Sequence, residues 1–167
     1  YPSLYDGTIF WQGSDGEDSE IYYWDGTSII QITNNEFSDD RPSGHNGCVA
    51  WEGRGSFIGS EIFYWDGSDI IQVTNNNHSD DLASLYNGTI AWRTDLTGRG
   101  INYDIFYWDG NNIIQVTDDE FGKRRLSNHD RIIAWEGSDG NDYEIYYAVL
   151  NPQPVEVDGD LNGDSVI

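Results

Sequence analysis

The amino-acid sequence predicts an all-β fold built from four repeated units, and three observations lead to this prediction. Trp11, Trp51, Trp92 and Trp135 recur at intervals of 40, 41 and 43 residues. The segments around them are rich in β-branched and aromatic residues and are separated by Gly, Asp and Asn, which is typical of short strands joined by turns. Helical periodicity of the apolar residues is absent. Self-similarity with a period of about 40 to 50 residues is typical of propellers and other repeat folds.

The first unit shows the strands of the repeat in chain order. A weak strand signal at Pro2–Tyr5 is followed by an apolar strand at Thr8–Trp11. Two further strands are predicted at Glu20–Trp24 and Ile29–Thr33. Asp25-Gly26 lies between these two and predicts a tight hairpin turn, because both central positions of such a turn can take positive φ. Each unit is therefore expected to contain four antiparallel strands.

The strands also indicate that both of their faces are buried. Glu61–Trp65 is apolar on both alternating faces, whereas a strand with one solvated face would alternate apolar with polar residues. A blade between two neighbours in a propeller has both faces covered. We therefore predict a β-propeller region at residues 1–157 with four blades of about 42 residues, either complete or part of a larger or oligomeric propeller. The predicted blades span roughly residues 1–40, 41–81, 82–125 and 126–157.

The charge of the chain excludes some classes of partner. Its 167 residues carry a net charge of −22 and include a single Lys, Lys123. Contacts to phosphates need Lys and Arg, so we expect no nucleic-acid partner. The apolar runs are much shorter than the roughly 20 residues that a membrane helix needs, so we expect no membrane insertion. The single Cys48 excludes an internal disulfide framework.

The repeat motifs resemble those of TolB-like propellers, the bacterial relatives of WD-repeat blades. The residues that carry the resemblance are Ile133-Ala134-Trp135, Gly137-Ser138-Asp139-Gly140, Glu144-Ile145-Tyr146-Tyr147, Trp108-Asp109-Gly110, Gln115-Val116-Thr117 and Asp39-Asp40-Arg41-Pro42-Ser43. The sequence departs from the pattern at Gly44, where an aromatic residue is usual. The resemblance implies a propeller that serves as a binding platform or scaffold, in a bacterial protein.

The tail at residues 158–167 resembles the start of a dockerin-type calcium loop. Asp160, Asn162 and Asp164 occupy positions 1, 3 and 5 of such a loop, and Val166 occupies position 7, which contributes a backbone carbonyl. Ser165 stands where the turn glycine is usual. The resemblance implies calcium as the cofactor to consider and a further calcium-binding module in the parent protein.

Two loops and one cluster are further candidates for function. Asp15 and Asp18 in the first unit, and Asp139 and Asp142 in the fourth, lie in equivalent acidic loops that could hold calcium. A solvated hairpin loop on an acidic protein is the preferred interpretation of both. Lys123-Arg124-Arg125 replaces the acids of the other units and could bind an acidic protein partner, or pair with acids of the next blade. The residues predicted to build the blades are Trp11, Trp51, Trp92, Trp135, Trp24, Trp65 and Trp108.

The repeat favours an architectural role over catalysis. No motif of a known catalytic type marks one unit, and the recurring acids are expected to build the blades. The leading hypothesis is a non-catalytic, secreted propeller scaffold or interaction module that associates with itself or with other extracellular proteins, as in an assembly or filament. The alternatives are a carbohydrate- or peptide-binding platform of a dockerin-bearing enzyme, and a propeller-fold lyase or glycosidase.

Overall fold

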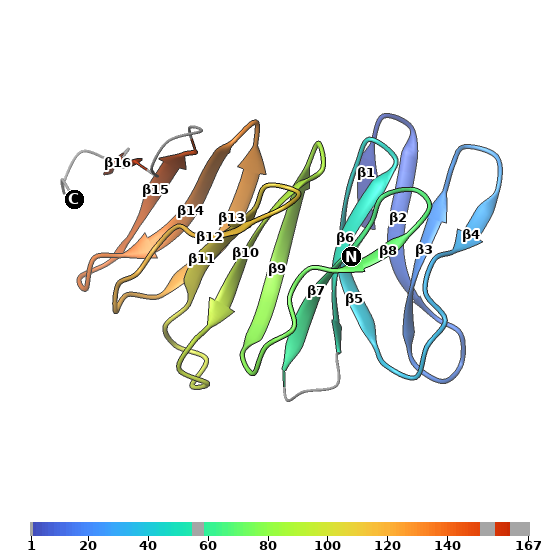
Figure 1. Ribbon diagram of the computed structural model, residues 1–167, viewed down its shortest axis with the longest axis horizontal. Coiled ribbons are helices and arrows are strands. Elements are labelled where there is room, and N and C mark those ends of the chain that lie inside the picture. Colours follow the sequence, from blue (N-terminus) through green and yellow to red (C-terminus); the bar gives the residue numbers. More distant parts are fainter. Residues whose placement is uncertain (1, 55–58, 151–155, 161–167) are drawn as a thin grey trace.

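The computed structural model describes residues 2–54, 59–150 and 156–160, and for residues 156–160 it describes the strand alone. Within this part of the chain there are four antiparallel four-stranded sheets and no helix. Figure 1 shows the sheets side by side in chain order, with the first and the last at opposite ends of the row. The prediction of an all-β fold with four-stranded blades is confirmed.

The strands of each blade follow one another in space as they do in sequence. Blade 1 contains β1 (Pro2–Tyr5), β2 (Thr8–Ser14), β3 (Ser19–Trp24) and β4 (Ile29–Gln31). Blade 2 contains β5 (Asp39–His45), β6 (Cys48–Arg54), β7 (Ser60–Trp65) and β8 (Ile70–Gln72). Blade 3 contains β9 (Ser79–Tyr86), β10 (Thr89–Asp95), β11 (Asp104–Trp108) and β12 (Ile113–Gln115). Blade 4 contains β13 (Lys123–His129), β14 (Ile132–Ser138), β15 (Tyr143–Val149) and β16 (Glu156–Asp160).

The first strands of blades 2, 3 and 4 begin before the boundaries drawn from the sequence. β5 starts at Asp39, because its pairing with β6 continues on the N-terminal side of a bulge between Asp40 and Ser43. Arg41 lies in this bulge with a φ of 52°, and Leu82 and Arg125 take the same conformation at 54° and 50°. The bulge bends the strand so that both of its halves pair with the second strand.

The tightest turns join the first and second strands. Asp6-Gly7 has φ angles of 42° and 77°, as a two-residue type I′ turn requires. The equivalent turn of blade 4 is Asp130-Arg131, in which Arg131 has a φ of 65° although it is not glycine. The turn at Asp25-Gly26 differs from the prediction, because only Gly26 has a positive φ. Asp25 instead accepts hydrogen bonds from the backbone N–H groups of residues 27 and 28, at 2.7 and 2.8 Å, and these bonds lower its pKa.

Three apolar clusters fill the spaces between successive blades. The alternation of side chains along a strand sends Trp51 toward blade 1 and Ala50 toward blade 3. Each blade thus has a face toward the preceding blade, called here its N-side face, and a face toward the following blade, called its C-side face. The clusters contain Phe10, Ile21, Val49 and Trp51 between blades 1 and 2; Ala50, Ile62, Tyr64, Leu85, Ile90 and Trp92 between blades 2 and 3; and Ala91, Ile105, Tyr107, Val116, Ile133, Trp135, Tyr146, Ala148 and Leu150 between blades 3 and 4. Both faces of an internal blade are covered.

The repeated tryptophans lie at the centre of the blades. Trp51, Trp92 and Trp135 are at most 3% exposed, whereas Trp11 on the N-side face of blade 1 is half-buried. Each ring stacks on an aromatic ring of the third strand; the Trp51–Phe63 centroid distance, for example, is 5.8 Å. The tryptophans of the third strands are half-buried, and Trp65 and Trp108 contact tyrosine rings of the preceding blade. Trp24 is half-buried on the N-side face of blade 1.

Candidate functional site

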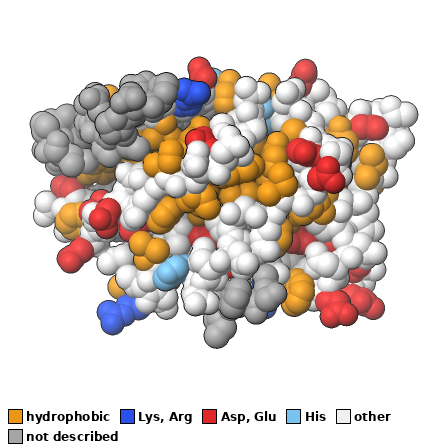
Figure 2. Space-filling view, in the orientation of Figure 1, with side chains coloured by type: hydrophobic (Ala, Val, Ile, Leu, Met, Phe, Trp, Pro, Cys, Tyr) orange, Lys and Arg blue, Asp and Glu red, His pale blue; other side chains and the backbone are white. Residues whose placement is uncertain are grey.

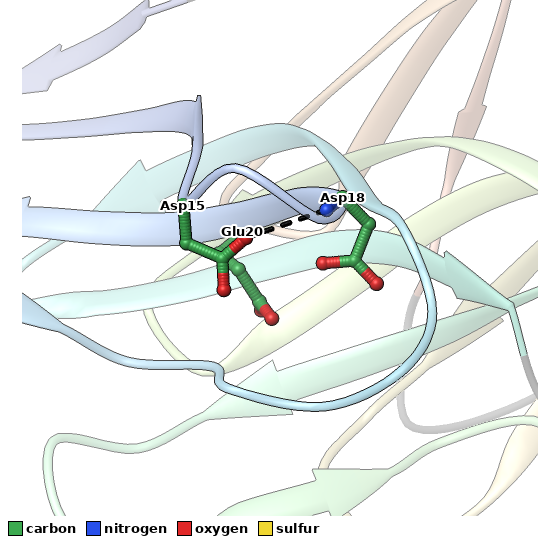
Figure 3. A group of neighbouring side chains, drawn as sticks. All are labelled: Asp15, Asp18 and Glu20. Atoms are coloured by element: carbon green, nitrogen blue, oxygen red, sulfur yellow. Dashed lines mark hydrogen bonds between the residues drawn. The ribbon is translucent and has the colours of Figure 1, made fainter.

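The acidic loop of blade 1 brings three carboxylates together. One oxygen each of Asp15, Asp18 and Glu20 lies within 4.8 Å of the others. Figure 3 shows the three side chains converging from the turn between β2 and β3 and from the start of β3. The backbone N–H groups of Glu17 and Asp18 donate to Oδ1 of Asp15 and lower the pKa of that carboxyl. Glu20 is fully buried, and its Oε1 accepts the backbone N–H of Asn35 at 2.9 Å.

The equivalent loop of blade 4 has the same turn but a different grouping of acids. Oδ1 of Asp139 accepts the backbone N–H groups of Asn141 and Asp142, at 2.8 and 3.2 Å. Among the described residues, only the blade 1 loop gathers three metal-ligating side chains. Of the calcium-like tail, Asp160 ends β16, while Asn162, Asp164 and Val166 lie outside the described residues.

The cluster Lys123-Arg124-Arg125 does not form a common basic surface. Lys123 is 3% exposed, and its ammonium contacts Asp119 and lies 3.5 Å from Asp104 of blade 3. Arg124 is exposed and stacks on the ring of Tyr143, at 3.2 Å from the ring centroid. Arg125 is exposed and pairs with Glu136 at 2.8 Å. Lys123 therefore serves the contact between blades 3 and 4, and a partner-binding role for the two arginines stays a prediction.

The position of Lys123 holds an acid in blades 2 and 3. Asp39 accepts the indole N–H of Trp51 at 2.8 Å, and burial together with Glu20 raises the pKa of Asp39. Asp80 lies against Glu61, whose pKa is likewise raised, first by burial. The contacts between blades 1 and 2 and between blades 2 and 3 thus bury two acids each, and Lys123 replaces one of the two in the third contact.

Glu52 is a carboxyl whose pKa lies far above its ordinary value. Its Oε1 accepts the backbone N–H of Leu82 in blade 3 at 2.5 Å, and its Oε2 accepts from Arg41 at 3.0 Å. Burial outweighs both contacts and raises the pKa of Glu52 to about 7. In blade 1 the amide of Gln12 has the same place, and its Oε1 accepts the backbone N–H of Arg41 at 2.9 Å. The raised pKa therefore belongs to a link between blades.

Two open grooves repeat at the contacts between blades. One, of about 550 Å³, lies between blades 1 and 2 and is lined by residues that include Asn35, Phe37 and Arg54. The other, of about 280 Å³, lies between blades 2 and 3 and includes Asn76 and His78. Because the lining positions correspond, the grooves are a product of the repeat. Figure 2 shows that hydrophobic side chains also form a band across one face of the array.

The two ends of the blade array carry a further functional candidate, the apolar faces that no other blade in the described part of the chain covers. Ile145 on the C-side face of blade 4 is 38% exposed, although Ile21, Ile62 and Ile105 at the equivalent positions are fully buried. Leu4 on the first strand of blade 1 is 73% exposed, while the equivalent Leu85 is 5% exposed. The sequence predicts that end blades are as apolar as the middle ones, but identifying the exposed residues required the faces to be known.

Comparison with solved structures identifies the fold. The β-propeller domain of the Trilobed protease from Pyrococcus furiosus matches with a TM-score of 0.68 and 10% identity, over 90% of this chain and 50% of that one. TolB from Acinetobacter baumannii matches with a TM-score of 0.63 and 17% identity, over 93% of this chain and 42% of that one. A chain of the nidogen/laminin complex matches with a TM-score of 0.55 and 12% identity, over 93% and 62%. The fold of the described part of the chain is thus that of a β-propeller.

Sequence comparison adds no closer assignment. No family model matches the chain, and no curated protein matches it either. The chain spans half or less of the protease propeller and of TolB, so the likeness concerns the fold of the shared blades. The described part of the chain has no helix that is long and apolar enough to cross a membrane.

Proposed function

We propose that the chain is a non-catalytic, extracellular propeller module that binds protein through the two end faces of its blade array. The exposure of Ile145 is the observation that carries this proposal, because three equivalent isoleucines are fully buried against a following blade. The isoleucine at this position is buried at every contact between blades. Its exposure on blade 4 therefore indicates a face that another protein surface covers. The nidogen/laminin chain, which shares the fold, is part of a protein complex.

The hydrogen bonds of the repeated acids support the non-catalytic part of this proposal. Oε1 of Glu61 accepts the backbone N–H of Asn76 at 3.1 Å, and Asp80 accepts the hydroxyl of Thr94 at 2.5 Å. These carboxylates are at most 1% exposed and hold the blades together. The extracellular location is supported by the resemblance of the tail to a calcium loop. The proposal therefore assigns the protein to scaffolds and interaction modules.

The test is the concentration dependence of the mass in solution. Sedimentation velocity on the 18.9 kDa chain should show association, and Ile145→Asp should abolish it while leaving the far-ultraviolet circular dichroism spectrum unchanged. Ile71→Asp is the matched control, because Ile71 is 38% exposed, as Ile145 is, but lies on strand β8 of the internal blade 2 and therefore outside both end faces. A chain that stays monomeric at about 100 μM, a concentration well above the dissociation constants of specific complexes, would refute the proposal.

A further inference from the structure

The first strands of the blades follow a two-blade alternation within the four-blade repeat. Blades 1 and 3 end this strand with Leu-Tyr, at Leu4-Tyr5 and Leu85-Tyr86, whereas blades 2 and 4 end it with His45 and His129. The four rings form one row of tilted contacts, with centroid distances of 4.0, 4.4 and 4.1 Å. An even-numbered blade therefore presents histidine to the tyrosine of the odd-numbered blade that follows it.

The contact from blade 2 to blade 3 shows how an even blade binds an odd one. The hydroxyl of Ser43 accepts the backbone N–H of Leu85 at 3.0 Å. Nδ1 of His45 accepts the backbone N–H of Asn87 at 3.1 Å. Ala50 of blade 2 and Leu85 of blade 3 belong to the same apolar cluster. The contact is thus defined by a serine, a histidine and a small residue on one side, and by Leu-Tyr on the other.

Blade 4 carries the first half of this contact on its open face. Ser127 and His129 are exposed, and they correspond to Ser43 and His45. Ala134 corresponds to Ala50 and is only half-buried. The equivalent serines of the earlier blades each accept a backbone N–H from the following blade, Ser3 from Gly44 at 2.8 Å for example.

Blade 1 carries the second half of the contact, and the two halves match in size. Leu4 and Tyr5 correspond to Leu85 and Tyr86, and Leu4 is 73% exposed. Size matters here because the contact between blades 1 and 2 pairs Phe10 with Gly44, where an added Cβ would lie 2.1 Å from the phenyl ring. The open face of blade 4 carries Ala134 at the position of Phe10, which leaves room for Leu4.

We propose that a second copy of this chain covers both end faces, so that blade 4 of each copy packs on blade 1 of the other and two copies close an eight-blade ring. The inference rests on the proposed function and names the partner. Two identical head-to-tail contacts close the ring if the blade-to-blade rotation continues unchanged. The four blades match the protease propeller domain over 50% of its length, which supports a ring of more than four blades.

The test combines two variants that each block one end face. Leu4→Asp blocks blade 1 and Ile145→Asp blocks blade 4, so neither variant should associate alone. Their mixture should form a pair through the one contact that remains intact. Wild type should reach a plateau at about twice the 18.9 kDa of one chain and should dissociate at least about 100-fold less readily than the mixed pair, because its second contact forms within one complex.

Each other outcome has a definite meaning. Growth of wild type beyond two copies would overturn the ring but retain the proposed function, because the same faces would then build a filament. Association of Leu4→Asp alone would overturn the head-to-tail arrangement, because it would show that blade 4 binds blade 4. A monomeric wild type would overturn both the ring and the proposed function.

A second inference rests on an independent observation in the acidic loop of blade 1. Oε2 of Glu20 is buried and has no hydrogen-bond partner among the described residues, and the same holds for Oδ1 of Asp18. Glu20 is fully buried, and its carboxylate lies against Asp15 and Asp18. Oε2 of the equivalent Glu61 also lacks a partner, but no such group of carboxylates surrounds it in the described part of blade 2.

The geometry points to a calcium ion bound by Asp15, Asp18 and Glu20. Three converging carboxylate oxygens supply the hard ligands that calcium prefers, and backbone carbonyls of a loop commonly complete its coordination. A cation would also satisfy the buried oxygens of Glu20 and Asp18, whose burial without a partner is otherwise unfavourable. The net charge of −22 adds to the attraction for a cation.

Isothermal titration of the metal-free chain with calcium chloride tests this site. We expect saturable binding with a dissociation constant on the order of 10⁻⁴ to 10⁻³ M, the range of extracellular modules. Asp18→Asn should weaken this binding at least about tenfold, while Asp142→Asn, the matched control in blade 4, should leave it unchanged. The predicted calcium loop in the tail could bind a second ion, so the test compares the calcium affinities of the two variants. No saturable binding by about 10 mM, or equal losses in the two variants, would overturn the proposal.

Discussion

Replacement of Glu52 by Gln should make the protein more stable at neutral pH. Burial raises the pKa of Glu52 from about 4.5 to about 7 in the folded protein. The folded state then binds this proton more tightly than the unfolded state does. The resulting stability is fully present below about pH 4.5 and is lost as pH rises through about 7. Gln carries no charge at any of these pH values, so it escapes that loss.

The magnitude follows from the size of the pKa difference. Each pKa unit corresponds to about 1.4 kcal/mol, so wild type should lose about 2 to 3 kcal/mol relative to Glu52→Gln between pH 5 and pH 8. The substitution keeps the bond to the N–H of Leu82, as Gln12 shows in blade 1 at 2.9 Å from the N–H of Arg41. The lost ion pair with Arg41 costs little, because that side chain is 48% exposed.

The assay is urea denaturation followed by tryptophan fluorescence, at constant ionic strength, from pH 5 to pH 8. Glu136→Gln is the control, because Glu136 forms the equivalent ion pair with Arg125 at 2.8 Å but its side chain is 23% exposed. The control measures the loss of the ion pair in a less buried setting. Parallel stability curves for wild type and Glu52→Gln, or a wild type that is the more stable at pH 8, would refute the reasoning.

Three further predictions concern turns and blade contacts, and each is measured as the free energy of unfolding in urea. Arg131→Gly should stabilise the protein by about 0.5 to 1 kcal/mol, since φ is 65° at Arg131, whereas Gly47→Ala, at a φ of 78°, should destabilise it by about 1 kcal/mol. Phe10→Ala should cost about 3 to 5 kcal/mol of stability. Adding Gly44→Leu should recover part of that loss, because the pair then reproduces Ala50 with Leu85. If the effects of the two substitutions on the free energy of unfolding were additive, the size matching would be refuted. Ser43→Ala should cost about 1 to 2 kcal/mol, because the N–H of Leu85 then loses its partner; no change would show that this bond adds little.

The repeat made the fold predictable from sequence, and it also explains where prediction stopped. A strand signal recurring with Trp11, Trp51, Trp92 and Trp135 needs no knowledge of neighbouring blades, and it gave four-stranded sheets that the structure confirms. The buried state of Lys123 depends on Asp104 in the preceding blade, which no local pattern reveals. The exposed state of Ile145 likewise depends on what lies beyond its own blade.

One signal of the end faces was present in the sequence. The first strands alternate between Leu-Tyr in blades 1 and 3 and histidine in blades 2 and 4, and this alternation is visible without coordinates. The structural role of this alternation is not visible in the sequence. The four rings contact one another in a row only because the first strands of successive blades lie side by side; the rings are those of Tyr5, His45, Tyr86 and His129. An alternation with a period of two blades, on top of a sequence repeat with a period of one blade, is the pattern to search for in similar chains.

The charge of the chain constrains how its end faces can associate. Two copies that each carry a net charge of −22 repel one another, so the apolar contact of Leu4 and Ile145 must outweigh that repulsion. Salt screens repulsion between exposed charges and leaves apolar burial in place, and the Debye length falls from about 10 Å at 0.1 M to about 3 Å at 1 M. Association through the end faces should therefore strengthen as salt is added. A complex held mainly by surface ion pairs, such as one built on Arg124 and Arg125, would weaken instead, and the sign of the salt dependence thus separates the two surfaces.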